Sequence, residues 1–149
     1  MNFLDTNVLL YALSTDRAET RKAARARQLL DQVDCAVSVQ VLQEFYVQVT
    51  RESKPDRITQ DQAVALIRSF ERFKVQEITS EIMHAAFRTK KRFRISYWDA
   101  AIVEAARAAG CNLVYSEDLN DGQEFGGVRV QNPFGENPHA KQTSPHLPL

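Results

Sequence analysis

The sequence predicts an α/β domain with a small, mostly parallel β-sheet between helices, a three-layer architecture. Short apolar segments alternate with longer amphipathic ones along the chain, which is the pattern of β-α units. The length of 149 residues suits one domain with one core. The sequence shows no internal repeat.

The first half of the chain gives two strand-helix units. Residues 2–4 read as a short buried strand that leads through a turn into a helix. Residues 16–33 form a good amphipathic helical pattern, and residues 35–38 a second strand. Ser38 is placed to cap a helix over residues 39–51.

The second half continues the alternation. Thr59 and Gln62 have the spacing of a capping box and predict a helix through Phe73. The remaining expected elements are a strand at 75–78, a helix at 80–91, a helix after Asp99 that ends at Gly110, and strands at 112–115 and 128–131. We expect the domain to span residues 1–134, followed by a Pro-rich, disordered tail at 135–149.

Composition and charge narrow the class of protein. The chain is 44% hydrophobic and carries 19 basic and 19 acidic residues, so it has no bulk positive charge for binding polyanions. No apolar run approaches the roughly 20 residues that span a bilayer, and we expect a cytoplasmic protein without membrane contact. In that compartment, Cys35 and Cys111 are expected to be two buried free thiols.

Four acids stand at the ends of apolar elements. Asp5 interrupts the apolar run "FLDTNVLL", and Asp118 follows the strand "NLVY" by two residues. Glu44 lies on a helix with a wide apolar stripe, and Asp99 follows "ISYW". In open parallel sheets, ligands bind at the carboxyl ends of the strands, where such residues would meet if their strands are neighbours.

Each acid also has a simpler interpretation. Asp5 and Asp99 suit helix N-caps, Glu44 a solvated helix position, and Asp118 a turn. Their joint placement is better explained by a shared site. Gathered carboxylates repel one another unless a cation neutralises them, and all-oxygen ligands suit Mg²⁺ or Mn²⁺. Such a site predicts metal-assisted attack on a phosphodiester.

Other site chemistries have less support. The three histidines are His84, which has no partner at ligand spacing, and His139 and His146 in the expected tail, so a zinc site is poorly supported. The sequence contains no glycine-rich nucleotide-binding loop of the common types and no G-x-S-x-G motif.

The four acids lie in motifs that resemble those of PIN-domain ribonucleases, and most closely those of VapC-like toxins of type II toxin-antitoxin modules. The motifs are "LDTN" with Asp5, "LQEF" with Glu44, "SYWDAAIVEAA" with Asp99 and "SEDLNDGQ" with Asp118. Each motif is weak by itself, but their order and spacing agree over residues 1–134. The resemblance implies a PIN fold with these four acids around Mg²⁺ or Mn²⁺.

The same resemblance implies further roles. Thr6, Asn7 and Ser116 would hydrogen-bond the carboxylates or a bound water, and Asp121 would be an additional acid. The implied reaction is endonucleolytic cleavage of RNA that leaves 5′-phosphate and 3′-hydroxyl ends. The implied partners are a cognate antitoxin that blocks the acidic pocket and a second copy in a homodimer.

A basic segment precedes the acid at 99. The run "FRTKKRFR" at 87–94 interleaves two phenylalanines with cations and predicts an RNA-binding surface; its cations are Arg88, Lys90, Lys91, Arg92 and Arg94. A second cluster is interpreted as a solvated helix face; it comprises Arg17, Arg21, Lys22, Arg25 and Arg27.

Two alternatives remain open at this point. A haloacid-dehalogenase-like phosphatase would also use Mg²⁺ and an Asp after the first strand, but it needs a second Asp where this chain has Asn7. A non-catalytic PIN module that binds RNA or protein is the other alternative, against which the presence of all four acids counts.

Overall fold

A five-stranded parallel sheet forms the centre of the computed structural model, which describes residues 1–32 and 34–135. The strands are β1 (Asn2–Leu4), β2 (Cys35–Ser38), β3 (Lys74–Gln76), β4 (Leu113–Tyr115) and β5 (Arg129–Gln131). Their order is β3-β2-β1-β4-β5, and every neighbouring pair is parallel. The strand order therefore reverses between β1 and β4, and the carboxyl ends beside such a switch point are where α/β sheets bind ligands.

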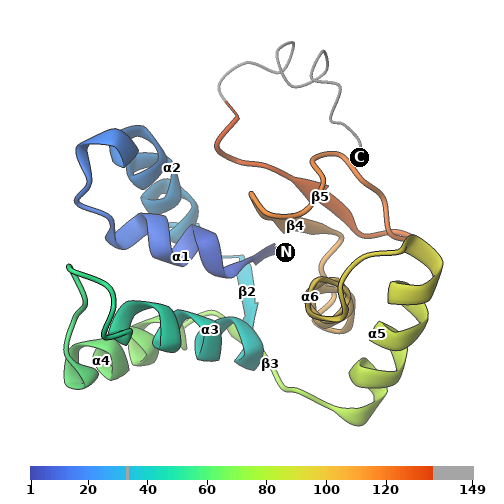
Figure 1. The fold of residues 1–149 in the computed structure, drawn as a ribbon. Helices are drawn as coiled ribbons and strands as arrows, with labels where there is room; N and C mark the ends of the chain where they lie inside the picture. Colours follow the sequence, from blue (N-terminus) through green and yellow to red (C-terminus); the bar gives the residue numbers. More distant parts are fainter. Residues whose placement is uncertain (33, 136–149) are drawn as a thin grey trace.

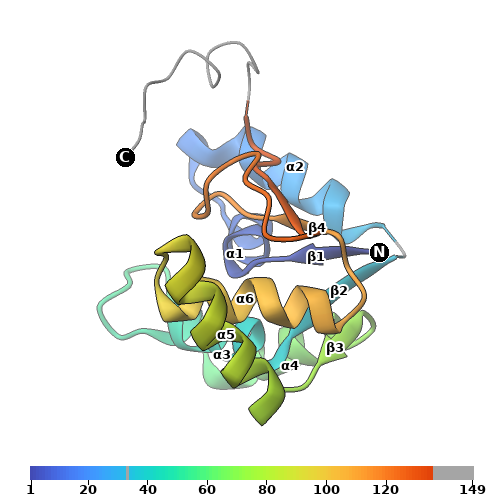
Figure 2. The ribbon, with the colours of Figure 1, turned by 90° about the vertical axis from the view of Figure 1, so that its right-hand side faces the viewer.

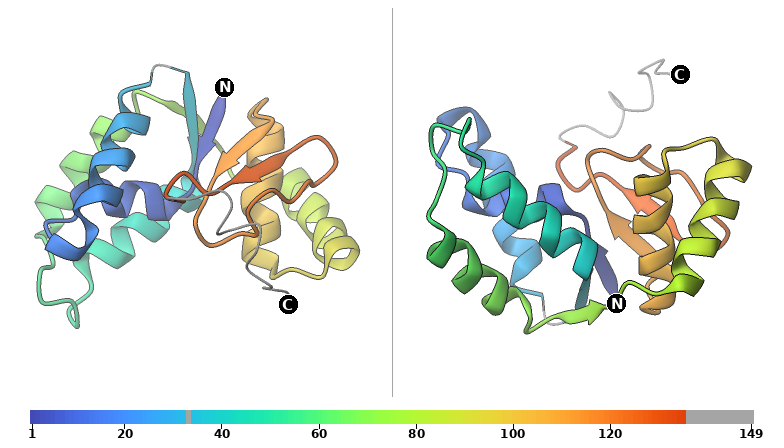
Figure 3. Two further views of the ribbon diagram at one scale, coloured as in Figure 1. Left: turned by 90° about the horizontal axis from the view of Figure 1, so that it is seen from above. Right: turned by 60° about the horizontal axis from the view of Figure 1, so that its bottom comes forward.

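Helices cover both faces of this sheet. On one side lie α1 (Thr6–Leu13), α2 (Thr20–Leu30), α3 (Val39–Thr50) and α4 (Gln60–Phe70), and on the other α5 (Ser80–Phe93) and α6 (Tyr97–Ala108) (Figures 1 and 3). Figure 2 shows α6 against the sheet with α5 outside it. The predicted three-layer α/β architecture is confirmed.

The alanine-rich sequence of α6 explains why it lies at the centre of its layer. Ala100 and Ala106 are fully buried, and seven consecutive residues of the helix from Ala100 to Ala106 lie in the interior. Small side chains let the helix approach the sheet on one side and Ala86 of α5 on the other. The helix ends at Ala108 and not at Gly110 as predicted. Gly110 follows the C-cap, and its φ of 86° allows the amide of Cys111 to bond the carbonyl of Ala106.

Several predicted boundaries need correction. The helix predicted over 16–33 begins instead as a short 3-10 helix, η1 (Arg17–Glu19), and its α-helical part ends at Leu30. The helix predicted to reach Phe73 ends at Phe70, because the chain turns there and buries Phe73 in the core. The third strand is 74–76 rather than 75–78, and the last two each begin one residue later than predicted.

Three other expectations have different outcomes. Cys35 and Cys111 are buried free thiols, as predicted. No helix within the described residues combines the length and apolarity that crossing a bilayer requires. The tail predicted at 135–149 lies, apart from Gly135, outside the described residues.

Candidate active site

Asp5 sits where β1 ends and α1 begins, at the switch point of the sheet. It is the N-cap of α1, and its Oδ1 accepts a 2.8 Å hydrogen bond from the amide of Thr6. Its Oδ2 accepts a 2.7 Å bond from Ser116 Oγ, which follows the neighbouring strand β4. Asp5 is therefore both a helix cap and one half of a contact that joins β1 to β4.

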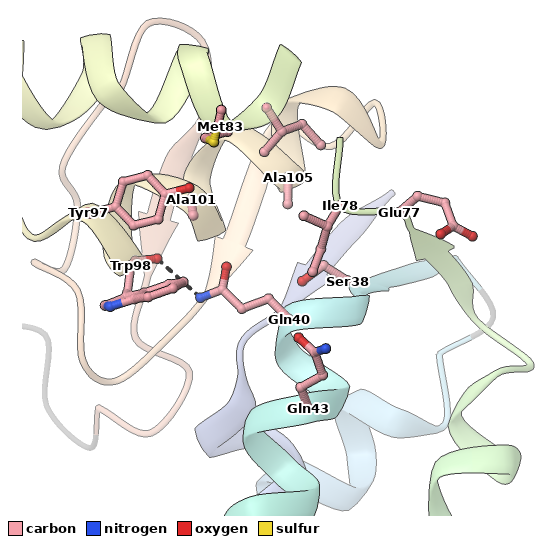
Figure 4. A pocket seen from close by; sticks show the side chains of 11 residues that line it. Ser38, Gln40, Gln43, Glu77, Ile78, Met83, Tyr97, Trp98, Ala101 and Ala105 are labelled. Atoms are coloured by element: carbon pink, nitrogen blue, oxygen red, sulfur yellow. Dashed lines mark hydrogen bonds between the residues drawn. The ribbon is translucent and has the colours of Figure 1, made fainter. Parts of the chain in front are cut away.

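Glu44 is half-buried on α3 and hydrogen-bonded at both oxygens, so it is not a freely solvated residue. Thr6 Oγ1 donates to Oε1 over 2.7 Å, and Gln40 Nε2 donates to Oε2 over 3.3 Å. The same Gln40 amide lies 3.4 Å from the carbonyl oxygen of Trp98, in the first turn of α6 (Figure 4). Gln40 thus links the acid of α3 to the helix that carries Asp99.

Asp118 lies in the loop after β4 with an exposed carboxylate. Asn7 Nδ2 donates to its Oδ2 over 3.2 Å, and Asn7 Oδ1 accepts from the amide of Glu117 at the same distance. The amide of Asp118 donates to Ser116 Oγ over 3.1 Å. The side chains of Asn7 and Ser116 therefore hold this loop from two sides.

Asp99 is the third residue of α6 and not its N-cap. Ser96 is the cap instead, and its Oγ accepts a 3.0 Å bond from the amide of Asp99. The helix consequently starts at Tyr97, two residues before the acid that was predicted to precede it. The capping interpretation of Asp99 is wrong.

The four acids share one electrostatic environment. Burial raises the pKa of Asp5 to about 6, opposed by its bonds from Ser116 and Thr6. Burial also raises the pKa of Asp99. The negative charges of Asp118 and Glu44 add to both increases, so these two acids lie within electrostatic reach of Asp5 and of Asp99.

This donor set matches the chemistry of a hard divalent cation. It is made of carboxylate oxygens, and their mutual repulsion is what a cation would relieve. Within residues 1–32 and 34–135, no three acid, histidine or cysteine side chains stand close enough together to hold an ion as they are. Mg²⁺ suits such an open arrangement because it binds through few carboxylates and keeps several of its waters.

The other predicted site residues lie in two places. Asp121 makes its contact elsewhere, with Oδ1 accepting a 2.8 Å bond from the amide of Asn132 beyond β5. The five predicted RNA-binding cations, Arg88, Lys90, Lys91, Arg92 and Arg94, are all exposed at the C-terminal end of α5. Of the two interleaved aromatics, Phe87 is 49% exposed, whereas Phe93 packs on Phe125 with ring centroids 4.9 Å apart.

Part of the second basic cluster is structural rather than solvated. Lys22 bonds Glu117 over 2.5 Å, and Tyr11 donates to the same carboxylate over 2.5 Å. Arg25 donates to the carbonyl of Pro133, and Arg27 to that of Ala12. These bonds attach α2 to α1 and to the loops after β4 and β5.

Sequence reasoning missed Gln40 and the group formed by Tyr11, Lys22 and Glu117. Gln40 had a local signal, because a residue four positions before Glu44 lies on the same helix face. The other group had none, because Lys22 and Glu117 are 95 residues apart in the chain.

The comparisons with known proteins agree with this fold. No curated protein matches the sequence. Solved structures with similar folds include a toxin-antitoxin complex from Klebsiella pneumoniae, at TM-score 0.63 and 19% identity over 89% of this chain and 98% of that one. Another is Mycobacterium tuberculosis VapC20, described as a sarcin-ricin loop cleaving toxin, at TM-score 0.61 and 18% identity over 79% and 90% of the two chains.

A third similar structure is DNA-bound VapBC from Salmonella typhimurium, at TM-score 0.61 and 17% identity over 87% of this chain and 96% of that one. At these identities the likeness is one of fold. The family model for the PIN domain matches residues 3–120, a range that contains all four acids. Together with the five-stranded parallel sheet, that match identifies the chain as a member of the PIN-domain family.

Proposed function

We propose that the chain is a Mg²⁺- or Mn²⁺-dependent endoribonuclease and the toxin of a type II toxin-antitoxin pair, inhibited by a cognate antitoxin. The observation that carries this proposal is that a PIN domain carries four carboxylates on elements around the switch point of its sheet. Each comes from a different element, and these are Asp5 after β1, Glu44 on α3, Asp99 on α6 and Asp118 after β4.

Each hydrogen bond at the site has a role if a divalent metal ion binds there. When bound, the ion would lower the pKa of a coordinated water and stabilise charge on the phosphate. Asp5, Glu44, Asp99 and Asp118 would hold it. Thr6, Asn7 and Ser116 fix three of these carboxylates by hydrogen bonds, so that little reorganisation is needed on binding. Asp121 supports the loop that carries Asp118.

The exposed end of α5 is the proposed path for the RNA backbone. Arg88, Lys90, Lys91, Arg92 and Arg94 offer positive charge directly before α6, whose first turn holds Asp99. Cations there would offset the repulsion between phosphates and the acidic site. The chain as a whole has no net charge, so this local surface must supply the attraction.

The partners follow from the proteins of similar fold. Structures described as a toxin-antitoxin complex and as a toxin that cleaves the sarcin-ricin loop favour an antitoxin and an RNA substrate for this chain. We extend the proposal to a homodimer in the cytoplasm, and to a PIN domain that ends near residue 134.

The test is cleavage of total RNA by the purified chain, freed of any partner. Discrete fragments are expected with Mg²⁺ or Mn²⁺, and none with EDTA or with Asp5→Asn or Asp99→Asn. Asp61→Asn makes the same chemical change on the exposed first turn of α4 and should cleave normally. Cleavage that survives both site substitutions would refute the proposal.

The non-catalytic alternative predicts a different pattern in the same assay. A binding module would retain RNA on the intact protein without cutting it in either metal. The phosphatase alternative does not suit a PIN domain, and the position two residues after Asp5 is held by Asn7, which bonds Asp118.

A further inference from the structure

Side-chain oxygens hold the backbone of the loop after β4. The amide of Glu117 donates to Asn7 Oδ1 over 3.2 Å, and the amides of Asp118 and Leu119 donate to Ser116 Oγ. Asp118 itself is exposed, and its carboxylate accepts a 3.2 Å bond from Asn7 Nδ2. Because this distance is at the long end of the range for hydrogen bonds, the contact restrains the exposed acid only weakly.

The neighbouring residue Glu117 has much shorter contacts. Tyr11 Oη donates to its Oε1 over 2.5 Å, and Lys22 Nζ donates to its Oε2 over 2.5 Å. Lys22 Nζ also donates to Tyr11 Oη over 3.2 Å, which closes a triangle of hydrogen bonds. Short bonds to a charged group restrain geometry more strongly than neutral ones. Together, Tyr11, Lys22 and Glu117 form a clamp on the loop.

The clamp is built on the helix that also provides Asn7. Tyr11 lies four positions after Asn7 on α1, so the two side chains share one face of that helix. Phe134 packs on the Tyr11 ring with ring centroids 4.8 Å apart, and Lys22 Nζ lies 4.9 Å from the centroid of the same ring. The side chains of Lys22 and Glu117 are 38% and 26% exposed, so water competes only partly for their charges.

The position of the clamp in the loop connects it to the acidic site. Glu117 stands between Ser116, which bonds Asp5, and Asp118. Adjacent residues are joined by a planar peptide bond, so fixing the Glu117 side chain restricts the orientations that Asp118 can adopt. A partly exposed ion pair contributes little to folding stability. The clamp is therefore better explained by the acid that it places than by the stability that it adds.

We propose that Tyr11 and Lys22 are positioning residues for the metal site, which hold the Glu117 carboxylate and thereby place Asp118 to bind the divalent ion. This rests on the proposed function, because it explains how one acid of that site is placed. It gives a role in metal affinity to a lysine that lies 95 residues before its partner in the chain and on another helix, α2.

The affinity of the chain for Mn²⁺, measured by titration calorimetry without RNA, tests this inference. By Coulomb's law alone, removing a cation near acids would strengthen the binding of another cation. If Lys22 acts by positioning, Lys22→Met should instead weaken Mn²⁺ binding, by about tenfold, as for other supporting contacts of metal ligands. Unchanged or tighter Mn²⁺ binding by this variant would overturn the proposal.

Tyr11→Phe tests the clamp without changing any charge. The variant removes the hydroxyl and keeps the ring that packs on Phe134, and it should weaken Mn²⁺ binding severalfold. Tyr46→Phe is the matched control, because it removes a tyrosine hydroxyl that bonds Gln60 and joins α3 to α4. It should leave Mn²⁺ binding unchanged. Equal losses of affinity from both substitutions would contradict a role specific to Tyr11.

A double-variant cycle tests whether Lys22 acts through Glu117. In a Glu117→Ala background, Lys22→Met should cause no further loss of Mn²⁺ affinity, because the carboxylate that the lysine holds is gone. Additive losses would contradict the proposal. Lys54→Met removes the lysine of another ion pair, with Asp56, and should leave the affinity unchanged in both backgrounds. Thermal unfolding confirms that each variant is folded at the temperature of the titration.

RNA cleavage separates this inference from the proposed function. If both hold, Lys22→Met should need about tenfold more Mn²⁺ for its half-maximal rate and regain the parental rate at saturating Mn²⁺. Weaker Mn²⁺ binding by the variant, with no cleavage by the unmodified chain, would refute the nuclease and support the clamp. Cleavage by the unmodified chain, with equal Mn²⁺ binding by Lys22→Met, would do the reverse. Absence of Mn²⁺ binding by the unmodified chain would overturn both.

Discussion

Ser116 Oγ donates a 2.7 Å hydrogen bond to Asp5 Oδ2, so the residue that follows β4 holds the acid that ends β1. The same hydroxyl oxygen accepts from the amides of Asp118 and Leu119, at 3.1 and 3.3 Å. Ser116 is fully buried. One side chain therefore positions an acid on each of the two strands that flank the switch point.

Ser116→Ala should lower both stability and activity. The variant leaves Asp5 Oδ2 and two amides without this partner, and buried polar groups that lose a partner cost about 1–3 kcal/mol of unfolding free energy. Loss of such a supporting contact typically lowers metal affinity or activity by about 10–100-fold. Urea unfolding and the cleavage rate measure the two effects. Ser69→Ala, which removes an exposed helix hydroxyl on α4, should leave both values unchanged.

Asp5→Asn should stabilise the metal-free protein at neutral pH while abolishing cleavage. Burial raises the pKa of Asp5 to about 6 in the folded protein from its ordinary value of 3.8. The folded chain thus binds this proton more tightly than the unfolded chain does. As pH rises from about 4 to 6 and Asp5 ionises, the free energy of unfolding falls by roughly 3 kcal/mol in total. The asparagine carries no such cost, so the variant should be the more stable by about that amount at pH 7.5.

The pH series supplies the control for this prediction. The stability difference between the two proteins should shrink as pH falls from 6 to 4, because Asp5 is then protonated in both states. Mg²⁺ should narrow the difference at pH 7.5 by stabilising the ionised form. A difference that stays constant over this pH range would show that the Asp5 carboxylate is not strained by its surroundings.

Thr6→Val should reduce cleavage with little effect on the fold. Valine has the shape of threonine but cannot donate the 2.7 Å bond to Glu44 Oε1. Without it, Glu44 keeps only the weaker contact from Gln40 and can leave the site. We expect a decrease in the cleavage rate of about 10-fold or more, by the rule for supporting contacts. Thr6→Ser retains the hydroxyl and should recover most of the rate, an outcome that a purely packing role for Thr6 would not produce.

Arg94→Gly should raise the stability of the protein and weaken its binding of RNA. Arg94 ends α5 in the left-handed conformation, with φ of 56°, which costs a residue with a side chain about 1–2 kcal/mol and glycine very little. The variant should be more stable by about 1 kcal/mol and bind RNA more weakly, with a shallower salt dependence. Arg94→Gln removes the charge without relieving the backbone, so it should reproduce the binding loss alone. Equal binding by all three proteins would remove Arg94 from the RNA path.

The sequence was sufficient for the fold class and for most elements, because their signals are local. The capping box of Thr59 and Gln62, the cap at Ser38 and the glycine after α6 are all present where local chemistry placed them. The start of α6 was misplaced because two residues compete for the cap. Ser96 takes it since a serine before "YWD" satisfies the amide of Asp99 itself.

What the sequence could not supply is which side chains meet. Adjacency of β1 and β4, on which the Asp5 to Ser116 contact depends, is a property of topology and has no local signature. The same is true of Phe93, which read as an exposed ring in a basic run and packs on Phe125 instead. Gln40 is an intermediate case. Its contact with Glu44 could be predicted from the helical spacing, whereas its contact with the carbonyl of Trp98 on α6 could not.

The pairing of β1 with β4 has a consequence for how the protein is made. During synthesis, Asp5 emerges from the ribosome early, while Ser116 and Asp118 emerge only when most of the domain has been translated. The nascent chain therefore lacks the contacts of Ser116 and Asp118 until late, and an unfinished chain is expected to lack the proposed cleavage activity. Activity would begin only after the last third of the domain has folded onto the first strand.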